Sequence, residues 1–134
     1  QLLLDYENQI RLVVRYFPNH NNSVLAAVAT EAAGAQGQYW EMQALLFERQ
    51  PEWGEQQTPQ TQRFIGYAQE LELDIARFTA DLENPTFLAK IERDRQDANT
   101  LRLTGTPTFF INGKPVEPFS VNRIREMIDQ IVGT

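Results

Sequence analysis

The arrangement of β-type segments along this 134-residue chain restricts its fold more than any other feature. Residues 10–17 are rich in β-branched and aromatic side chains and end at Pro18, which is typical of a strand. Segments 108–111 and 114–117 flank Asn112–Gly113, the strongest short hairpin signal in the chain. The residues between these two regions read as helices. The sequence therefore predicts an α/β fold whose sheet is interrupted by an inserted all-helical subdomain.

The expected helices are bounded by capping residues, glycines and prolines. Residues 2–7 read as the last turns of a helix, and a final helix follows Ser120. The insertion should contain a helix over 24–33 capped by Ser23, one over 38–50 stopped by Pro51, one carrying 64–71 capped by Thr58 or Thr61, a short one capped by Asp74 and a longer one from Pro85.

Helix 38–50 has apolar side chains at three- and four-residue spacing, which predicts one broad apolar face. The side chains in question are Tyr39, Trp40, Met42, Ala44, Leu46 and Phe47. A stripe of this kind is more often core than ligand site. We therefore expect Trp40 and Phe47 to be buried.

Composition excludes several classes of function. The formal net charge of −6 and the pI of about 4.8 give phosphate-backbone binding little support, so nucleic acid is not an expected partner. No stretch approaches the roughly 18–20 apolar residues of a spanning helix, so no membrane span is expected in this chain. The chain has no cysteine, which excludes disulfides, thiolate metal sites and thiol nucleophiles within it.

The remaining polar candidates favour ordinary surface roles. His20 is the only histidine, lies in a polar loop and has no second ligand nearby in sequence, so solvation is expected and a metal site is not. Glu92, Asp94 and Asp97 share a predicted helix with interleaved arginines. A solvated face is the expectation for these three carboxylates.

The chain resembles DsbA-like thiol:disulfide oxidoreductases over essentially its whole length. The resemblance is carried by residues 12–18, His20, Glu31–Ala33, the segments 36–42 and 45–47, and most closely by 105–113, Gly-Thr-Pro-Thr-Phe-Phe-Ile-Asn-Gly. Gln43 stands where the family often has histidine. The family begins with a strand and a Cys-X-X-Cys pair, whereas this chain enters at the end of the first helix. We expect the missing strand, both cysteines and most of that helix to lie upstream of Gln1.

The resemblance implies a single thioredoxin-fold domain over 1–134, with 1–22 and 101–134 as the thioredoxin-like part and 23–100 as the helical insertion. It implies that Pro107 is cis and that Gly105, Thr106 and Pro107 bind an extended polypeptide substrate by strand addition. It assigns no catalytic residue, metal or cofactor to this chain, a redox partner protein to the complete enzyme, and a periplasmic or other extracytoplasmic location.

The missing strand has a physical consequence. In the thioredoxin arrangement it lies centrally, between segment 10–17 and the hairpin, so its absence leaves backbone groups unpaired at about 1–3 kcal/mol each. That cost is prohibitive against a total stability of about 5–15 kcal/mol. We therefore expect that the chain does not fold alone in the family arrangement. A strand-exchanged homodimer or an associated N-terminal fragment would fill the gap.

Two other interpretations remain open. A natural redox-dead thioredoxin-like module would use the same cleft to hold peptides or a partner, and the sequence upstream of Gln1 discriminates it from the enzyme. An unrelated small helical protein would show a trans Pro107 and no pairing between segments 10–17 and 108–117.

Overall fold

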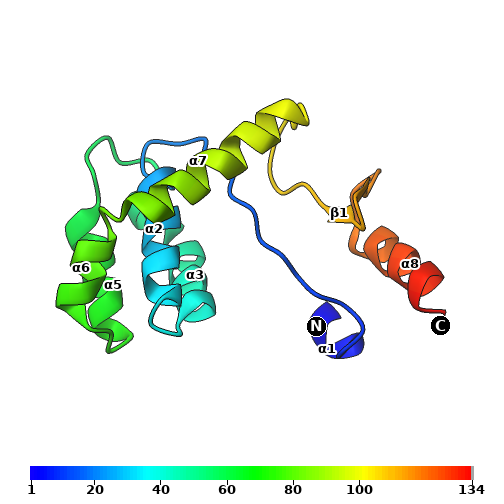
Figure 1. Ribbon diagram of the computed structural model, residues 1–134, viewed down its shortest axis with the longest axis horizontal. Helices are drawn as coiled ribbons and strands as arrows, with labels where there is room; N and C mark the ends of the chain where they lie inside the picture. Colours follow the sequence, from blue (N-terminus) through cyan, green and yellow to red (C-terminus); the bar gives the residue numbers. More distant parts are fainter. Residues whose placement is uncertain (134) are drawn as a thin grey trace. The chain divides into compact units, whose positions relative to one another are not determined.

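The computed structural model describes residues 1–133 and divides the chain into two compact units (Figure 1). The terminal unit comprises residues 1–14 and the chain from Leu101 onward, and the helical unit comprises Arg15–Thr100. The expected boundary lay between residues 22 and 23. Residues 15–22 group with the helical unit in the structure, where Arg15, Tyr16 and Asn22 all bond to it through their side chains.

The helical unit is built around one alanine-rich helix. Its elements are α2 (Ser23–Gly34), α3 (Tyr39–Glu48), α4 (Gln50–Trp53), α5 (Thr61–Glu70), α6 (Ile75–Asp81) and α7 (Pro85–Thr100). Small side chains along α2 let α3, α5, α6 and α7 all pack against it. Figure 1 shows these helices grouped around α2. The largest fully buried side chains of this unit are Phe64, Phe78, Met42, Ile91 and Val28.

The helix ends predicted from capping residues and prolines were only partly correct in this unit. Asp74 caps α6 by accepting a hydrogen bond from the Arg77 amide, as expected. Ser23 does not cap α2, because its hydroxyl instead accepts from the His20 amide. Pro51 does not end the helical run either; it lies in the first turn of α4, where a missing amide costs nothing.

The terminal unit contains α1 (Leu2–Asp5), β1 (Phe110–Ile111), β2 (Lys114–Pro115) and α8 (Val121–Val132). Asn112 and Gly113 both have positive φ angles, 48° and 79°, which is the turn expected of an Asn-Gly hairpin. The buried cluster of this unit consists of Tyr6, Val116, Ile124 and Ile128. Polar bonds close its edge: the Tyr6 hydroxyl donates to Asp129 at 2.6 Å, and Arg125 pairs with Asp5 at 2.5 Å.

The strand expected over 10–17 is absent, and that prediction was wrong. Residues 10–19 have no regular structure, and Leu12 and Val13 are 47% and 61% exposed. Within residues 1–133 the sheet consists of β1 and β2 alone, paired antiparallel with Phe110 opposite Pro115. A strand is held by hydrogen bonds to a neighbouring strand, and no described segment lies beside 10–17 in that way. The apolar pattern alone cannot make the strand.

Candidate functional site

The loop Gly105–Thr106–Pro107 leads directly into β1 in the terminal unit. The Thr106–Pro107 peptide bond is cis in this structure. Thr106 and Pro107 are exposed, whereas Gly105 is half-buried. The hydroxyl of Thr108 donates to the Gly105 carbonyl at 2.6 Å, so a side chain of the same loop holds its bend.

One edge of β1 has no strand partner among residues 1–133. The other edge pairs with β2, and the Val116 amide extends that pairing by donating to the Phe109 carbonyl at 2.9 Å. No backbone hydrogen bond from Thr106 occurs in the same described part of the chain. Exposed strand edges with free amides and carbonyls accept a further strand. The geometry therefore suits an extended polypeptide.

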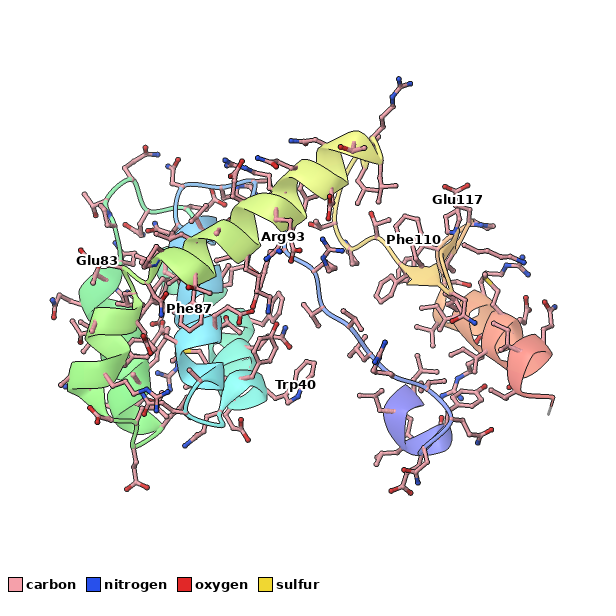
Figure 2. All side chains as sticks on the ribbon, viewed as in Figure 1. Trp40, Glu83, Phe87, Arg93, Phe110 and Glu117 are labelled. Carbon is pink, nitrogen blue, oxygen red and sulfur yellow. The ribbon has the colours of Figure 1, made fainter. Side chains whose placement is uncertain are left out.

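Aromatic side chains lie within and just beyond this hairpin. Phe109 stacks on Phe119 with ring centroids 5.1 Å apart and planes 6° apart. Phe119 is 54% exposed, and Phe110, labelled in Figure 2, is 41% exposed. Such rings offer apolar contact area at low entropy cost to a bound chain. These side chains offer contact surface but no reactive group. The chain contains no cysteine, and residues 1–133 hold no cluster of three metal-ligating side chains.

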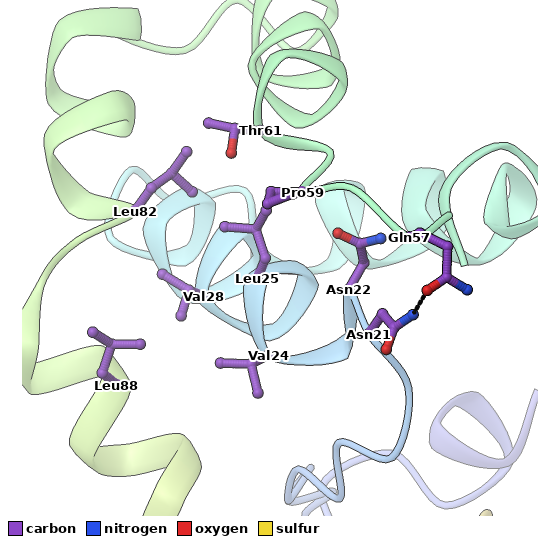
Figure 3. A pocket seen from close by; sticks show the side chains of 10 residues that line it. All are labelled: Asn21, Asn22, Val24, Leu25, Val28, Gln57, Pro59, Thr61, Leu82 and Leu88. Atoms are coloured by element: carbon purple, nitrogen blue, oxygen red, sulfur yellow. Dashed lines mark hydrogen bonds between the residues drawn. The ribbon is translucent and has the colours of Figure 1, made fainter. Parts of the chain in front are cut away.

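His20 and the pocket near it lie in the helical unit. His20 is exposed, with its Nδ1 atom 4.0 Å from a carboxylate oxygen of Glu55. A pocket of about 310 Å³ lies next to the start of α2, and Figure 3 shows its lining, mostly apolar, with an Asn21–Gln57 hydrogen bond at its rim. Its other polar side chain of note, Asn22, already has four backbone partners. The amides of Asn21 and Asn22 are therefore already hydrogen-bonded within the protein, whereas His20 is solvent-exposed, as expected.

The expectation of a solvated face on α7 was wrong for Asp94. Asp94 is 5% exposed and accepts from the Arg15 side chain at 2.5 Å and from the Tyr16 amide at 3.0 Å. Asp97, one turn further along, accepts from the same arginine at 2.5 Å. The spacing of three residues puts both carboxylates on one face of the helix, and this spacing was the only feature of the sequence that indicated a shared partner. The sequence did not identify Arg15 as that partner, because Arg15 and Asp94 are 79 residues apart in the chain.

Tyr16 also anchors a polar cluster that sequence reasoning missed. Its hydroxyl donates to Glu31 at 2.8 Å and lies 3.0 Å from the Tyr39 hydroxyl. Lys90 donates to the same Glu31 oxygen at 2.7 Å. Burial, reinforced by the hydrogen bonds to Tyr39 and Glu31, raises the pKa of Tyr16 well above its ordinary value. The cluster thus joins Tyr16, in the irregular segment before α2, to helices α2, α3 and α7.

The raised pKa of Tyr16 predicts a loss of stability in alkali. Below pH 10 the phenol is neutral in both states, but above it the unfolded chain loses this proton first and unfolding becomes more favourable. Each such tyrosine contributes a slope of at most about 1.4 kcal/mol per pH unit. Tyr16→Phe should therefore make the decline between about pH 10 and 11.5 shallower. Urea unfolding across this range measures the slope, and equal slopes in the two proteins would contradict the prediction.

Comparison with known proteins decides the family. Residues 1–130 match the Thioredoxin family. This chain belongs to the thioredoxin family. The family match agrees with the thioredoxin-like fold that the resemblance implies. Within residues 1–133 that fold has mostly helices and a small two-stranded sheet, without the strand expected over 10–17.

Curated relatives of this thioredoxin-family chain are named as antiporters. It is 38% identical over 109 residues to a Na⁺/H⁺ antiporter NhaA of Herminiimonas arsenicoxydans, with 81% of this chain and 17% of the relative aligned. It is 39% identical over 117 residues to Na⁺/H⁺ antiporter NhaA 1 of Salinispora arenicola, covering 85% of this chain and 17% of the relative. A Mycobacterium antiporter (strain KMS) is 36% identical over 116 residues, with 81% and 18% covered.

The chain thus spans less than a fifth of the length of these relatives. Among residues 1–133, no helix combines the length and the apolar character needed to cross a membrane.

Proposed function

We propose that this chain is the larger part of a DsbA-like thiol:disulfide oxidoreductase domain acting on extracytoplasmic polypeptides. The cysteine pair is carried, in this proposal, by a segment outside these 134 residues, since the chain has none. Support comes from the thioredoxin-family match over 1–130. The proposed compartment is the periplasm or another oxidising space, because stable disulfides form there.

The observation that carries the proposal is the exposed residue Thr106, whose backbone amide donates no backbone hydrogen bond within residues 1–133, together with the unpaired edge of β1. An extended polypeptide would hydrogen-bond along this edge and rest apolar side chains on Phe110 and Phe119. A cysteine thiolate of the complete domain would then attack a sulfur of a disulfide, forming one S–S bond while the other sulfur leaves as a thiolate. This exchange requires no cofactor, because the electrons stay within sulfur pairs.

Thr106→Pro should weaken binding of an unfolded, carboxymethylated polypeptide by about tenfold, because proline lacks the amide that a docked strand would use. Thr106→Ala removes only the side chain and should leave affinity within about twofold. Fluorescence anisotropy of a labelled polypeptide measures both. Equal affinities for the two variants would mean that the Thr106 backbone is not the docking edge.

Activity distinguishes the enzyme from a redox-dead binding module. The complete protein, including whatever precedes Gln1, should catalyse insulin reduction by dithiothreitol and lose that activity when the first cysteine of its pair becomes serine. A complete protein that has no Cys-X-X-Cys segment and is inactive would support the module instead. Polypeptide binding at Thr106 would survive in that case, so the two outcomes separate cleanly.

A second candidate function follows from the names of the relatives. The aligned region is a minor part of proteins named Na⁺/H⁺ antiporters, so we propose that this domain also acts as part of a larger antiporter protein. An antibody raised against the chain should then detect, in membranes of the source cells, a protein several times larger than 15.4 kDa. Detection of a 15.4 kDa species alone would exclude this candidate.

A further inference from the structure

The outer face of α3 differs from the expected buried stripe. Met42 and Leu46 do face the core, at 0% and 5% exposure, but Trp40 and Phe47 are 50% and 69% exposed. These two aromatic residues are seven positions apart, which places them on the same side of a helix, and Ala44 between them is also exposed. Figure 2 shows the Trp40 ring projecting from α3 away from the neighbouring helices of its unit. Large exposed aromatics grouped on one helix face are typical of an interaction surface.

Two carboxylates border these rings. Glu41 and Glu48 are exposed, and neither has an ion pair or side-chain hydrogen bond to any of residues 1–133. Arg49, the adjacent cation, is paired instead with Glu70 through two hydrogen bonds of 2.6 and 2.7 Å. We call Trp40, Glu41, Ala44, Phe47 and Glu48 the α3 face.

Carboxylates elsewhere in the helical unit are mostly neutralised within it. Lys90 pairs with Glu31, Arg63 with Glu52, and Arg15 with Asp94. The unit nevertheless has thirteen acidic and seven basic residues, so its excess equals the whole net charge of −6. The unit that carries the α3 face is therefore negatively charged, and the two carboxylates of that face have no partner among residues 1–133. The charge complement of such a surface is cationic.

We infer that the α3 face docks a cationic amphipathic polypeptide segment, with apolar side chains between Trp40 and Phe47 and lysines or arginines against Glu41 and Glu48. Aromatic rings bordered by carboxylates suit such a segment, since a Lys or Arg stem packs on the ring while its charge meets the acid. An anionic lipid surface does not fit, because the negative unit repels it. The inference concerns the helical unit alone and does not depend on the polypeptide-docking loop.

Binding is tested with the 134-residue chain and two matched probes: a helical peptide of leucine and lysine, and its counterpart with glutamate in place of lysine. The lysine peptide should shift Trp40 emission to shorter wavelength, since Trp53 is already buried at 8% exposure. Its affinity should fall steeply with added salt. Equal binding of the glutamate peptide, or of phosphatidylcholine vesicles, would overturn the inference.

The site is located by measuring the affinity of variants for the lysine peptide with isothermal titration calorimetry. Phe47→Ala should weaken binding of the lysine peptide about fivefold. The double variant Glu41→Lys with Glu48→Lys should weaken it about tenfold or more. The control variant Glu72→Lys with Glu83→Lys makes the same change in net charge at two other exposed positions. It should weaken binding of the lysine peptide less than threefold. Equal losses in the two charge-reversed proteins would assign binding to the general field and would sink the α3 face as the site. Far-UV circular dichroism confirms that each variant is folded.

Discussion

Replacing Phe64 by alanine should destabilise the helical unit by about 4 kcal/mol. The Phe64 side chain is 0% exposed and lies at the centre of an aromatic group. Its ring meets that of Trp53 edge-on at 5.4 Å and lies 6.0 Å from that of Tyr67. Alanine at this position leaves a cavity that the surrounding helices close only in part, because α3 and α6 already pack against both α2 and α5. Urea unfolding followed by circular dichroism measures the loss.

Phe47→Ala is the matched control for this change. It removes the same atoms from a side chain that is 69% exposed, so the free energy of unfolding should change by less than about 0.5 kcal/mol. The contrast separates burial from residue type. Similar losses at the two positions would show that Phe47 is covered in solution and would also contradict the open α3 face.

Replacing Asn22 by alanine should cost about 2–4 kcal/mol, although it removes only one small polar group. The Asn22 side chain is 2% exposed and holds the loop before α5: its amide donates to the carbonyls of Trp53, Gln56 and Thr58 at 3.0–3.3 Å. Its carbonyl accepts from the Gln60 amide at 3.1 Å. Alanine leaves all four backbone groups without this partner, and several of them are shielded from water.

Asn21→Ala is the control for Asn22. Asn21 is exposed and makes one long side-chain bond, to Gln57 at 3.3 Å, so its loss should change stability by less than about 0.5 kcal/mol. Hydrogen exchange supplies the second measurement, since only Asn22→Ala should speed exchange of the Gln60 amide. Unchanged exchange in Asn22→Ala would show that the loop is held by other contacts.

The features predictable from sequence were those that depend on neighbouring residues. The Asn112–Gly113 turn requires two positive φ angles, which these residue types tolerate, and the turn was correctly placed. Asp74 and Ser120 cap their helices through amides only three residues away. The loop Gly105–Thr106–Pro107 was identified instead from the resemblance to DsbA-like proteins, and its role as a substrate site stays a prediction.

The errors concern contacts between distant residues. Trp40 and Phe47 share the apolar spacing of Met42 and Leu46, yet α2 can cover only one side of α3. Periodicity therefore identified the helix but not the width of its buried face. Ser23 failed as a cap because a residue in the preceding loop, His20, uses its hydroxyl. Burial of Asp94 depended on an arginine far away in the sequence.

The amino-acid sequence was enough to predict the helical segments, the Asn-Gly hairpin, the lack of any thiol within the chain and its acidic character. Each of these follows from composition or from residues a few positions apart. The folded structure was needed to establish which apolar residues are buried, which carboxylates are paired, and that segment 10–17 is not a strand. Burial and pairing require a partner surface, and a strand requires a neighbour. A local sequence pattern encodes neither the partner surface nor the neighbouring strand, since residues distant in the chain or outside it supply them.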